Sequence, residues 1–162
     1  MPEPSVTLTA LHHLEDLRTG RVLVVGDVMG DTYLIGDALR ISPEAPVPVA
    51  RVEETRHLLG GAGNVARNIA ALAGNSVLVG LIGRDGDGDR LEAMLDEAGV
   101  VPRLVRGERP TTVKSRVLAR NQQMMRLDQE SLAPATPEEY AALVRVLEPL
   151  VPEFNVVVVS DY

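Results

Sequence analysis

The sequence contains no cysteine, no tryptophan and a single phenylalanine among its 162 residues. Without cysteine there is no disulfide framework and no thiolate metal site, which fits a reducing compartment such as the cytoplasm. Because aromatic residues make up only 2% of the chain, the core has to be built from Val, Leu, Ala and Ile, a composition that favours strands packed under helices. The length predicts one domain, since it is too short for two ordinary ones.

The chain also lacks an excess of basic residues. Its formal net charge of −7 is spread along the sequence, which argues against nucleic acid or an anionic membrane as the principal partner and favours a small solute. The segment 1–9 does not have the basic and apolar parts of a signal peptide, and no apolar run approaches the roughly 20 residues of a spanning helix. We expect a soluble, cytoplasmic protein.

Short apolar runs alternate with helical periodicity, and this alternation predicts an α/β fold with a parallel sheet. A T-x-x-E capping box at Thr136 to Glu139 marks the start of the last helix, and Gly74 is expected to close the helix at 64–73. The expected strands are 22–25, 77–82, 100–105 and 156–159. The expected helices are 8–19, 64–73, 136–147 and one that follows the turn at 83–89, has Leu91, Met94, Leu95 and Ala98 on one face and is stopped by Gly99.

Four consecutive valines, at 156–159, are typical of a strand buried on both faces of a parallel sheet. Such a strand needs helices on both sides, and nothing follows Tyr162 to supply them. Polar Ser160 and Asp161 stand at its ligand-facing end. The pattern predicts that the chain is one part of a larger domain.

Two further regions predict a small separate sheet. Residues 32–56 form short alternating pieces interrupted by prolines at 43, 46 and 48, which indicates exposed antiparallel strands. Residues 111–119 and 122–128 predict a hairpin that joins them. We expect these segments to form a lid over the ligand.

A glycine-rich stretch at 60–66 (GGAGNVA) precedes an alanine-rich helix. Its glycines let backbone N–H groups approach a polar ligand, and Asn64 can both donate and accept hydrogen bonds. The stretch also satisfies the dinucleotide fingerprint, with Asp85 placed 22 residues after Gly63. That fingerprint requires a buried strand before it, whereas 52–59 is charged. A structural helix start is the third alternative.

Two groups of charged residues, the carboxylates at 85–89 and the cations of 114–126, each allow a structural and a binding interpretation. The carboxylates at 85, 87 and 89 resemble half of a calcium loop, but Arg90 occupies the position of the required glycine, so turn glycines and an aspartate N-cap explain them better. Lys114 and Arg116 share one face of a strand, and Arg126 can join them from the paired strand. They form either a solvated face or a clamp for an anionic group. No P-loop sequence is present.

Six stretches together are highly distinctive: 24–31 (VVGDVMGD), 40–49 (RISPEAPVPV), 60–66, 114–116 (KSR), 119–123 (ARNQQ) and 160–162 (SDY). From residue 22 to 162 the chain resembles the ribokinase-like (phosphofructokinase-B) sugar kinases. Within them it is similar to the heptose-7-phosphate kinase domains of the bifunctional heptose kinase/adenylyltransferases of lipopolysaccharide core synthesis.

The resemblance implies a ribokinase-like three-layer α/β sandwich with a small β-sheet lid, truncated, in which 1–162 is the N-terminal sugar-binding part and 32–56 and 111–128 are the lid. The implied activity is phosphorylation of D-glycero-D-manno-heptose 7-phosphate at its anomeric hydroxyl, with ATP and Mg²⁺ as cofactors of the full-length protein. The implied partners are a small sugar phosphate and a second copy bound through the lid, and neither nucleic acid nor membrane.

By position, the resemblance also implies roles for individual side chains. No catalytic, nucleotide or metal residue is assigned here, because the family's glycine-rich anion hole, its aspartate base and its nucleotide-binding region have no match. Such a chain is expected not to turn over alone, since phosphoryl transfer needs those parts. An inert sugar-phosphate-binding or dimerising module is the alternative. The implied substrate-binding residues are Asp31, Gly60, Gly61, Asn64, Lys114, Arg116, Arg126 and Asp161.

Overall fold

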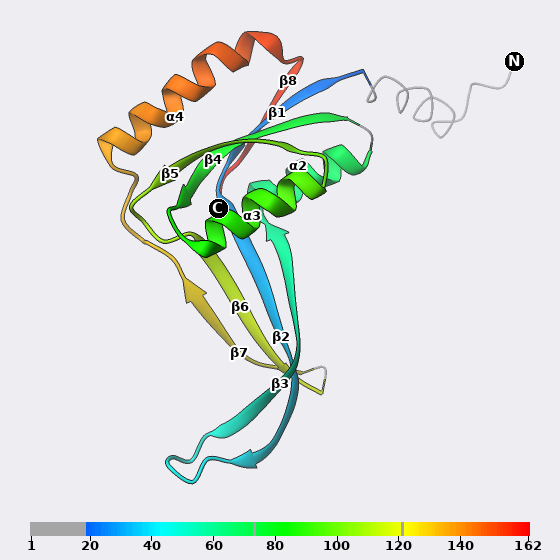
Figure 1. Ribbon diagram of the computed structural model, residues 1–162, viewed down its shortest axis with the longest axis vertical. Helices are drawn as coiled ribbons and strands as arrows, with labels where there is room; N and C mark the ends of the chain where they lie inside the picture. The colour runs from blue at the N-terminus through cyan, green and yellow to red at the C-terminus, as the bar shows by residue number, and fades with distance from the viewer. Residues whose placement is uncertain (1–18, 73, 121) are drawn as a thin grey trace, which may run out of the picture.

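The computed structural model describes residues 19–72, 74–120 and 122–162. One of its two sheets has four parallel strands in the order β5-β4-β1-β8, and helices lie on both sides of it (Figure 1). Each strand that the apolar runs predict is present in this sheet. Its members are β1 (Arg21–Gly26), β4 (Asn75–Gly83), β5 (Val101–Gly107) and β8 (Val156–Ser160).

Helices α2 (Gly61–Ala71) and α3 (Gly86–Glu97) cover one side of this sheet, and α4 (Pro137–Leu150) lies on the other (Figure 1). A short 3₁₀ helix, η1 (Val151–Glu153), follows α4. The capping box is confirmed, because Glu139 N donates to Thr136 Oγ1 over 3.2 Å and Thr136 N donates to Glu139 Oε2 over 2.8 Å. The helix predicted for 8–19 falls almost entirely outside the described residues.

Three predicted helix boundaries, two in α2 and one in α4, were wrong by a few residues. Helix α2 begins at Gly61 and not at Asn64, because β3 ends at Gly60 and the glycine backbone turns directly into the helix. It ends at Ala71, two residues before the predicted end, although Gly74 N donates to Ile69 O over 3.1 Å and closes the helix as expected. Helix α4 continues three residues past the predicted end.

The second sheet extends away from the parallel sheet and its helices (Figure 1). Its strand order is β3-β2-β6-β7; β2 pairs with β6 in parallel, and the two outer pairs are antiparallel. The predicted antiparallel strands are confirmed, and the break falls at the prolines: those at 43 and 46 lie in the turn, and the one at 48 begins a strand, where its missing N–H is tolerated. The two strands are longer than the short pieces that were expected. The strands are β2 (Val28–Ile41), β3 (Pro48–Gly60), β6 (Thr112–Ala119) and β7 (Gln122–Gln129).

Strand β8 is present, and within the described residues it lacks the cover on both faces that its valines predict for a complete sheet. It is an edge strand that pairs only with β1 among the described residues. Val156 and Val157 are half exposed, and Val159 is 73% exposed. The valines of β8 are therefore not covered by a layer of helices among the described residues.

The hydrophobic core lies between the parallel sheet and the two helices α2 and α3. Its side chains are small and aliphatic, as the scarcity of aromatic residues predicts. The core cluster comprises Val24, Val28, Leu59, Ala62, Ala66, Leu78, Ile82, Leu91, Leu95 and Val100.

A buried polar network joins the core to the start of β6. Asp85 caps α3 by accepting from Gly88 N over 2.8 Å, and it also accepts from Thr111 N and Thr111 Oγ1 over 2.8 and 2.7 Å. Thr111 Oγ1 in turn accepts from Gly83 N over 2.9 Å. This geometry supports the N-cap interpretation of Asp85. Because Thr111 is only 1% exposed, the network anchors β6 to the core.

Replacing Thr111 by Val should destabilise the fold by about 1–3 kcal/mol, because Gly83 N–H would be left buried without an acceptor. Thr112→Val is the matched control, since that half-buried side chain has no part in the network. Chemical denaturation measures both. Equal unfolding free energies for the two variants would contradict the role given to Thr111.

The same network predicts a pH dependence. Burial by itself would raise the pKa of Asp85, but hydrogen bonds from Thr111 and Gly88 outweigh it and hold that pKa below its usual value. A lowered folded pKa means that the carboxylate contributes stability above the unfolded pKa of about 3.9, and that this contribution is lost as pH falls through the folded value. The stability difference between the wild-type chain and Asp85→Asn should therefore be constant above about pH 5 and shrink in acid. Asp161→Asn controls for removal of an exposed carboxylate, and a difference that grows in acid would contradict the assignment.

Candidate functional site

The first sheet, the second sheet and helix α2 meet at Asp27, between β1 and β2. Asp27 N donates to Ser160 O over 3.1 Å, and Asp27 O accepts from Ala62 N over 2.9 Å. Its carboxylate Oδ2 accepts from Tyr162 N over 2.9 Å. These bonds gather the C-terminal ends of β1 and β8 and the N-terminus of α2 at one point. Ligands bind at this edge of open α/β sheets.

The glycine pair is required at this junction for steric reasons. Gly61 has a φ of +49°, and a Cβ there would lie 2.3 Å from Asp27 O. A Cβ on Gly60 would lie 2.9 Å from Asp31 Oδ2. The two glycines therefore allow the backbone to pass directly beside the Asp31 carboxylate.

Asp31 forms an ion pair across the second sheet. Arg116 Nη1 donates to Asp31 Oδ1, and each of the two side chains is 24% exposed. The hydrogen bond to Asp31 raises the pKa of the Arg116 guanidinium, against a desolvation effect that lowers it. The guanidinium carbon also lies 5.4 Å from the centre of the Tyr33 ring. The Asp31 carboxylate and the Arg116 guanidinium are thus paired with each other.

The three predicted cations share one face of the second sheet. Lys114 stands opposite Asp31 on β2 and Asp128 on β7, and the next outward-facing residue of its strand, Arg116, stands opposite Arg126. Partners in register point to the same side of a sheet. We call Lys114, Arg116 and Arg126 the cationic face. Its anionic neighbours balance it in part, since Arg126 Nε lies 2.8 Å from Asp128 Oδ1.

Two predicted site residues are not joined to this face. Asn64, in the first turns of α2, accepts a hydrogen bond from Arg67 Nη2 through its Oδ1 over 2.8 Å. Asp161 is exposed directly after β8, and within the described part of the chain no hydrogen bond or ion pair connects it to the other predicted residues. The structure brings together Asp31, Gly60 and the cationic face.

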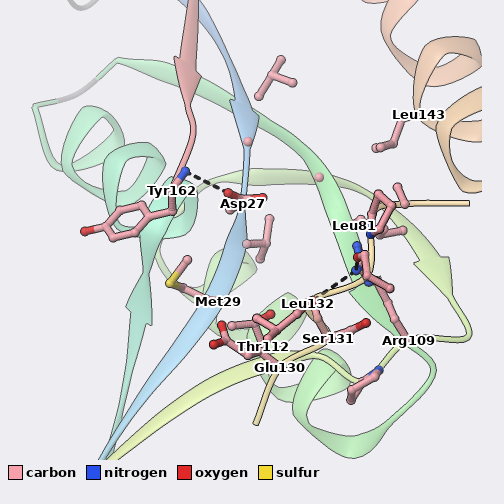
Figure 2. A pocket seen from close by; sticks show the side chains of 18 of the residues that line it. Asp27, Met29, Leu81, Arg109, Thr112, Glu130, Ser131, Leu132, Leu143 and Tyr162 are labelled. Atoms are coloured by element: carbon pink, nitrogen blue, oxygen red, sulfur yellow. Dashed lines mark hydrogen bonds between the residues drawn. The ribbon is translucent and has the colours of Figure 1, made fainter. Parts of the chain in front are cut away.

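A cavity of about 700 Å³ adjoins this junction (Figure 2). One wall is polar and includes Asp27, Lys114 and Tyr162, while Leu81 and Leu143 contribute an apolar wall. The Lys114 ammonium lies 5.7 Å from the centre of the Tyr162 ring. Lys114 stands opposite Asp31 on the neighbouring strand and also lines the cavity. The cavity is therefore next to the cationic face.

Sequence reasoning did not assign Tyr33, Asp128 or Tyr162 to the site. Tyr33 and Asp128 each lie two residues from a predicted site residue on the same strand, so alternation was a signal that points to both. Tyr162 was quoted within a motif, but its contacts with Asp27 and Lys114 depend on the tertiary fold.

The described residues do not fit a metal or dinucleotide site. Within 19–72, 74–120 and 122–162, no group of three or more His, Cys, Asp or Glu side chains is arranged to hold a metal ion. Helix α2 follows β3, an exposed antiparallel strand, and not the buried parallel strand of the dinucleotide fingerprint. We assign no chemical step to a metal or nucleotide here. None of the described helices is long and apolar enough to cross a membrane.

Comparison with known proteins identifies the family. Residues 19–161 match the pfkB family carbohydrate kinase. This chain belongs to that family. Heptose kinases are among its relatives. The chain is 49% identical over 151 residues to the D-beta-D-heptose 7-phosphate kinase of Bordetella bronchiseptica, and the match covers 91% of this chain and 47% of that protein.

Other relatives carry the name bifunctional protein HldE. The chain is 49% identical over 156 residues to the one from Caulobacter vibrioides, covering 94% of this chain and 32% of that protein. It is 44% identical over 149 residues to the one from Gluconacetobacter diazotrophicus, and this match covers 91% of this chain and 31% of that protein. The chain therefore spans between about a third and a half of the length of these relatives.

Solved structures confirm the predicted ribokinase-like fold. A carbohydrate kinase from Agrobacterium tumefaciens superposes with a TM-score of 0.67 at 19% identity, covering 86% of this chain and 45% of that one. The tetrameric inhibited form of phosphofructokinase-2 from Escherichia coli superposes with a TM-score of 0.64 at 22% identity, covering 87% of this chain and 45% of that one. At these identities the likeness concerns the fold alone.

The Asp31–Arg116 pair predicts a measurable coupling. In a double-mutant cycle with Asp31→Asn and Arg116→Met, the coupling free energy should be about 1 kcal/mol, because both side chains are shielded from water. The more exposed pair of Arg126 and Asp128 is the control and should couple by less than about 0.5 kcal/mol. Thermal or chemical denaturation gives both numbers, and additive Asp31 and Arg116 effects would contradict a formed ion pair.

Proposed function

We propose that this chain is the sugar-binding part of a kinase that phosphorylates D-glycero-D-manno-heptose 7-phosphate at its anomeric hydroxyl, in the synthesis of lipopolysaccharide core heptose. The observation that carries the proposal is the Asp31 carboxylate, held between Gly60 and a face of three cations. A carboxylate beside a bare backbone suits sugar hydroxyls, and a cationic face suits a phosphate. The names of the relatives support the heptose phosphate.

The division of roles follows from charge. Asp31, an acceptor, would receive a hydrogen bond from a sugar hydroxyl, and the backbone at Gly60 and Gly61 would pack against the ring. Lys114, Arg116 and Arg126 would bind the 7-phosphate or hydroxyls near it. An arriving phosphate competes with Asp31 for Arg116, so binding of the anion frees the carboxylate for a hydroxyl.

Asp161 follows a strand whose end meets the same junction through Ser160 O. In the proposal it lies near the sugar or the transferred phosphoryl group. ATP and Mg²⁺ would supply the phosphoryl group and its charge neutralisation in the full-length protein, in the cytoplasm. Because the family's aspartate base, glycine-rich anion hole and nucleotide-binding region have no match in this sequence, the 162-residue chain should bind sugar phosphate without producing ADP.

The second sheet would act as the lid, formed by about 32–56 and 111–128, within a sugar-binding part that extends over 1–162. Its outer end exposes apolar side chains of β2 and β3, including Leu39, Ile41 and Val52. Exposed apolar side chains on a projecting sheet favour contact with a second copy through the lid. An inert sugar-phosphate-binding or dimerising module remains the alternative function, supported by the same surface.

A chimera separates the kinase from the inert module. Residues 19–162 would replace the aligned segment of the Bordetella bronchiseptica kinase, to which the chain is 49% identical. The kinase proposal predicts that the chimera makes ADP from ATP only with the heptose phosphate. A folded chimera that binds the sugar phosphate without turnover would favour the inert module.

For the binding site, Asp31→Asn and Asn64→Ala should each weaken binding of heptose 7-phosphate to the 162-residue chain by at least about tenfold. The loss of one or two buried hydrogen bonds has this effect, at about 1.4 kcal/mol per factor of ten. Isothermal titration calorimetry measures the dissociation constants, with exposed Asn68→Ala as the control on the same helix. Unchanged affinity in both variants would remove these residues from the site.

A further inference from the structure

Asn64 and Arg67 lie three residues apart on α2, which places them on the same side of the helix. Arg67 Nη2 donates to Asn64 Oδ1 over 2.8 Å, and both side chains are half buried. The N-cap of α2 is Gly60, which has no side chain to bond the first turn. Among the described residues, Arg67 is the hydrogen-bond partner of the Asn64 side chain, and its hydrogen bond orients the amide.

The chemistry of the pair allows one orientation only. A guanidinium carries N–H donors and no acceptor, so the group facing it has to be the amide oxygen. The amide nitrogen of Asn64 then points away from Arg67. Asn64 consequently offers N–H donors to a ligand, even though an isolated asparagine side chain can offer either end.

Asp31 has the opposite hydrogen-bonding character. As a carboxylate it only accepts, and Oδ1 is already occupied by Arg116 while Oδ2 faces the backbone at Gly60. In the proposed sugar site, Asp31 therefore accepts hydrogen bonds and Asn64 donates them.

We propose that Arg67 is a positioning residue that fixes Asn64 as a hydrogen-bond donor, so that the site takes a sugar with one hydroxyl oxygen accepting from Asn64 and another hydroxyl donating to Asp31. Arg67 acts through Asn64 and does not touch the sugar. This inference rests on the proposed function, because it assumes that Asn64 and Asp31 hold the same sugar.

The test measures binding of D-glycero-D-manno-heptose 7-phosphate to the 162-residue chain and its variants by isothermal titration calorimetry. Arg67→Met keeps the length of the aliphatic stem but removes the donor, and it should weaken binding by about three- to tenfold, as expected for one misoriented hydrogen bond. Arg67→Lys keeps a group that only donates and should recover most of the affinity. Asn64→Asp keeps the shape and the contact with Arg67 but removes the donor to the sugar, and it should weaken binding by at least about tenfold.

A double-mutant cycle distinguishes positioning from other roles of Arg67. If Arg67 acts through Asn64, Arg67→Met should change the affinity little in the Asn64→Ala background. A loss that persists there would mean that Arg67 binds the phosphate or supports the helix, and it would overturn the inference. Thermal denaturation of each variant shows whether the helix itself is affected.

The remaining outcomes separate the inference from its premise. If the wild-type chain binds heptose 7-phosphate and Arg67→Met binds it equally well, the positioning role is overturned while the proposed function stands. If the folded wild-type chain does not bind heptose 7-phosphate, the proposed function is overturned and the inference falls with it.

Discussion

The close passage of the backbone at Gly60 and Gly61 is the constraint on which the rest of the structure depends. Here the second sheet ends and α2 begins, and Ala62 N is bonded to Asp27 O. No side chain can be accommodated at Gly61 without meeting that carbonyl. The same contact fixes the position of the second sheet's root against the parallel sheet, and with it the distance between Asp31 and the start of α2.

The charges of the candidate site are paired with one another within the chain. Asp31 is held by Arg116, and Arg126 is held by Asp128. A neutral sugar could replace only part of these interactions, and a simple anion would leave Asp31 without a partner. In the proposed function, a ligand with both hydroxyls and an anionic group would replace both kinds of contact, and a sugar phosphate has both.

Local sequence signals predicted the features that depend on neighbouring residues. The capping box of α4, the N-cap at Asp85 and the shared face of Lys114 and Arg116 all follow from fixed short spacings, and the structure has each of them. The sequence predicted that the hairpin of 111–128 joins the strands of 32–56, but not the parallel register of β2 with β6, because that pairing joins segments separated by two helices and three other strands. The ion pair of Asp31 and Arg116 depends on that pairing, and so does the place of Tyr162 beside Lys114.

The most direct test of this account is a crystal structure of the chain with D-glycero-D-manno-heptose 7-phosphate. The account predicts electron density for the phosphate within hydrogen-bonding distance of the cationic face, most directly of Arg116, and for a sugar hydroxyl beside Asp31 in place of the ion pair. A sugar phosphate bound instead against Leu81 and Arg109 in the neighbouring cavity, with the Asp31–Arg116 pair intact, would contradict it.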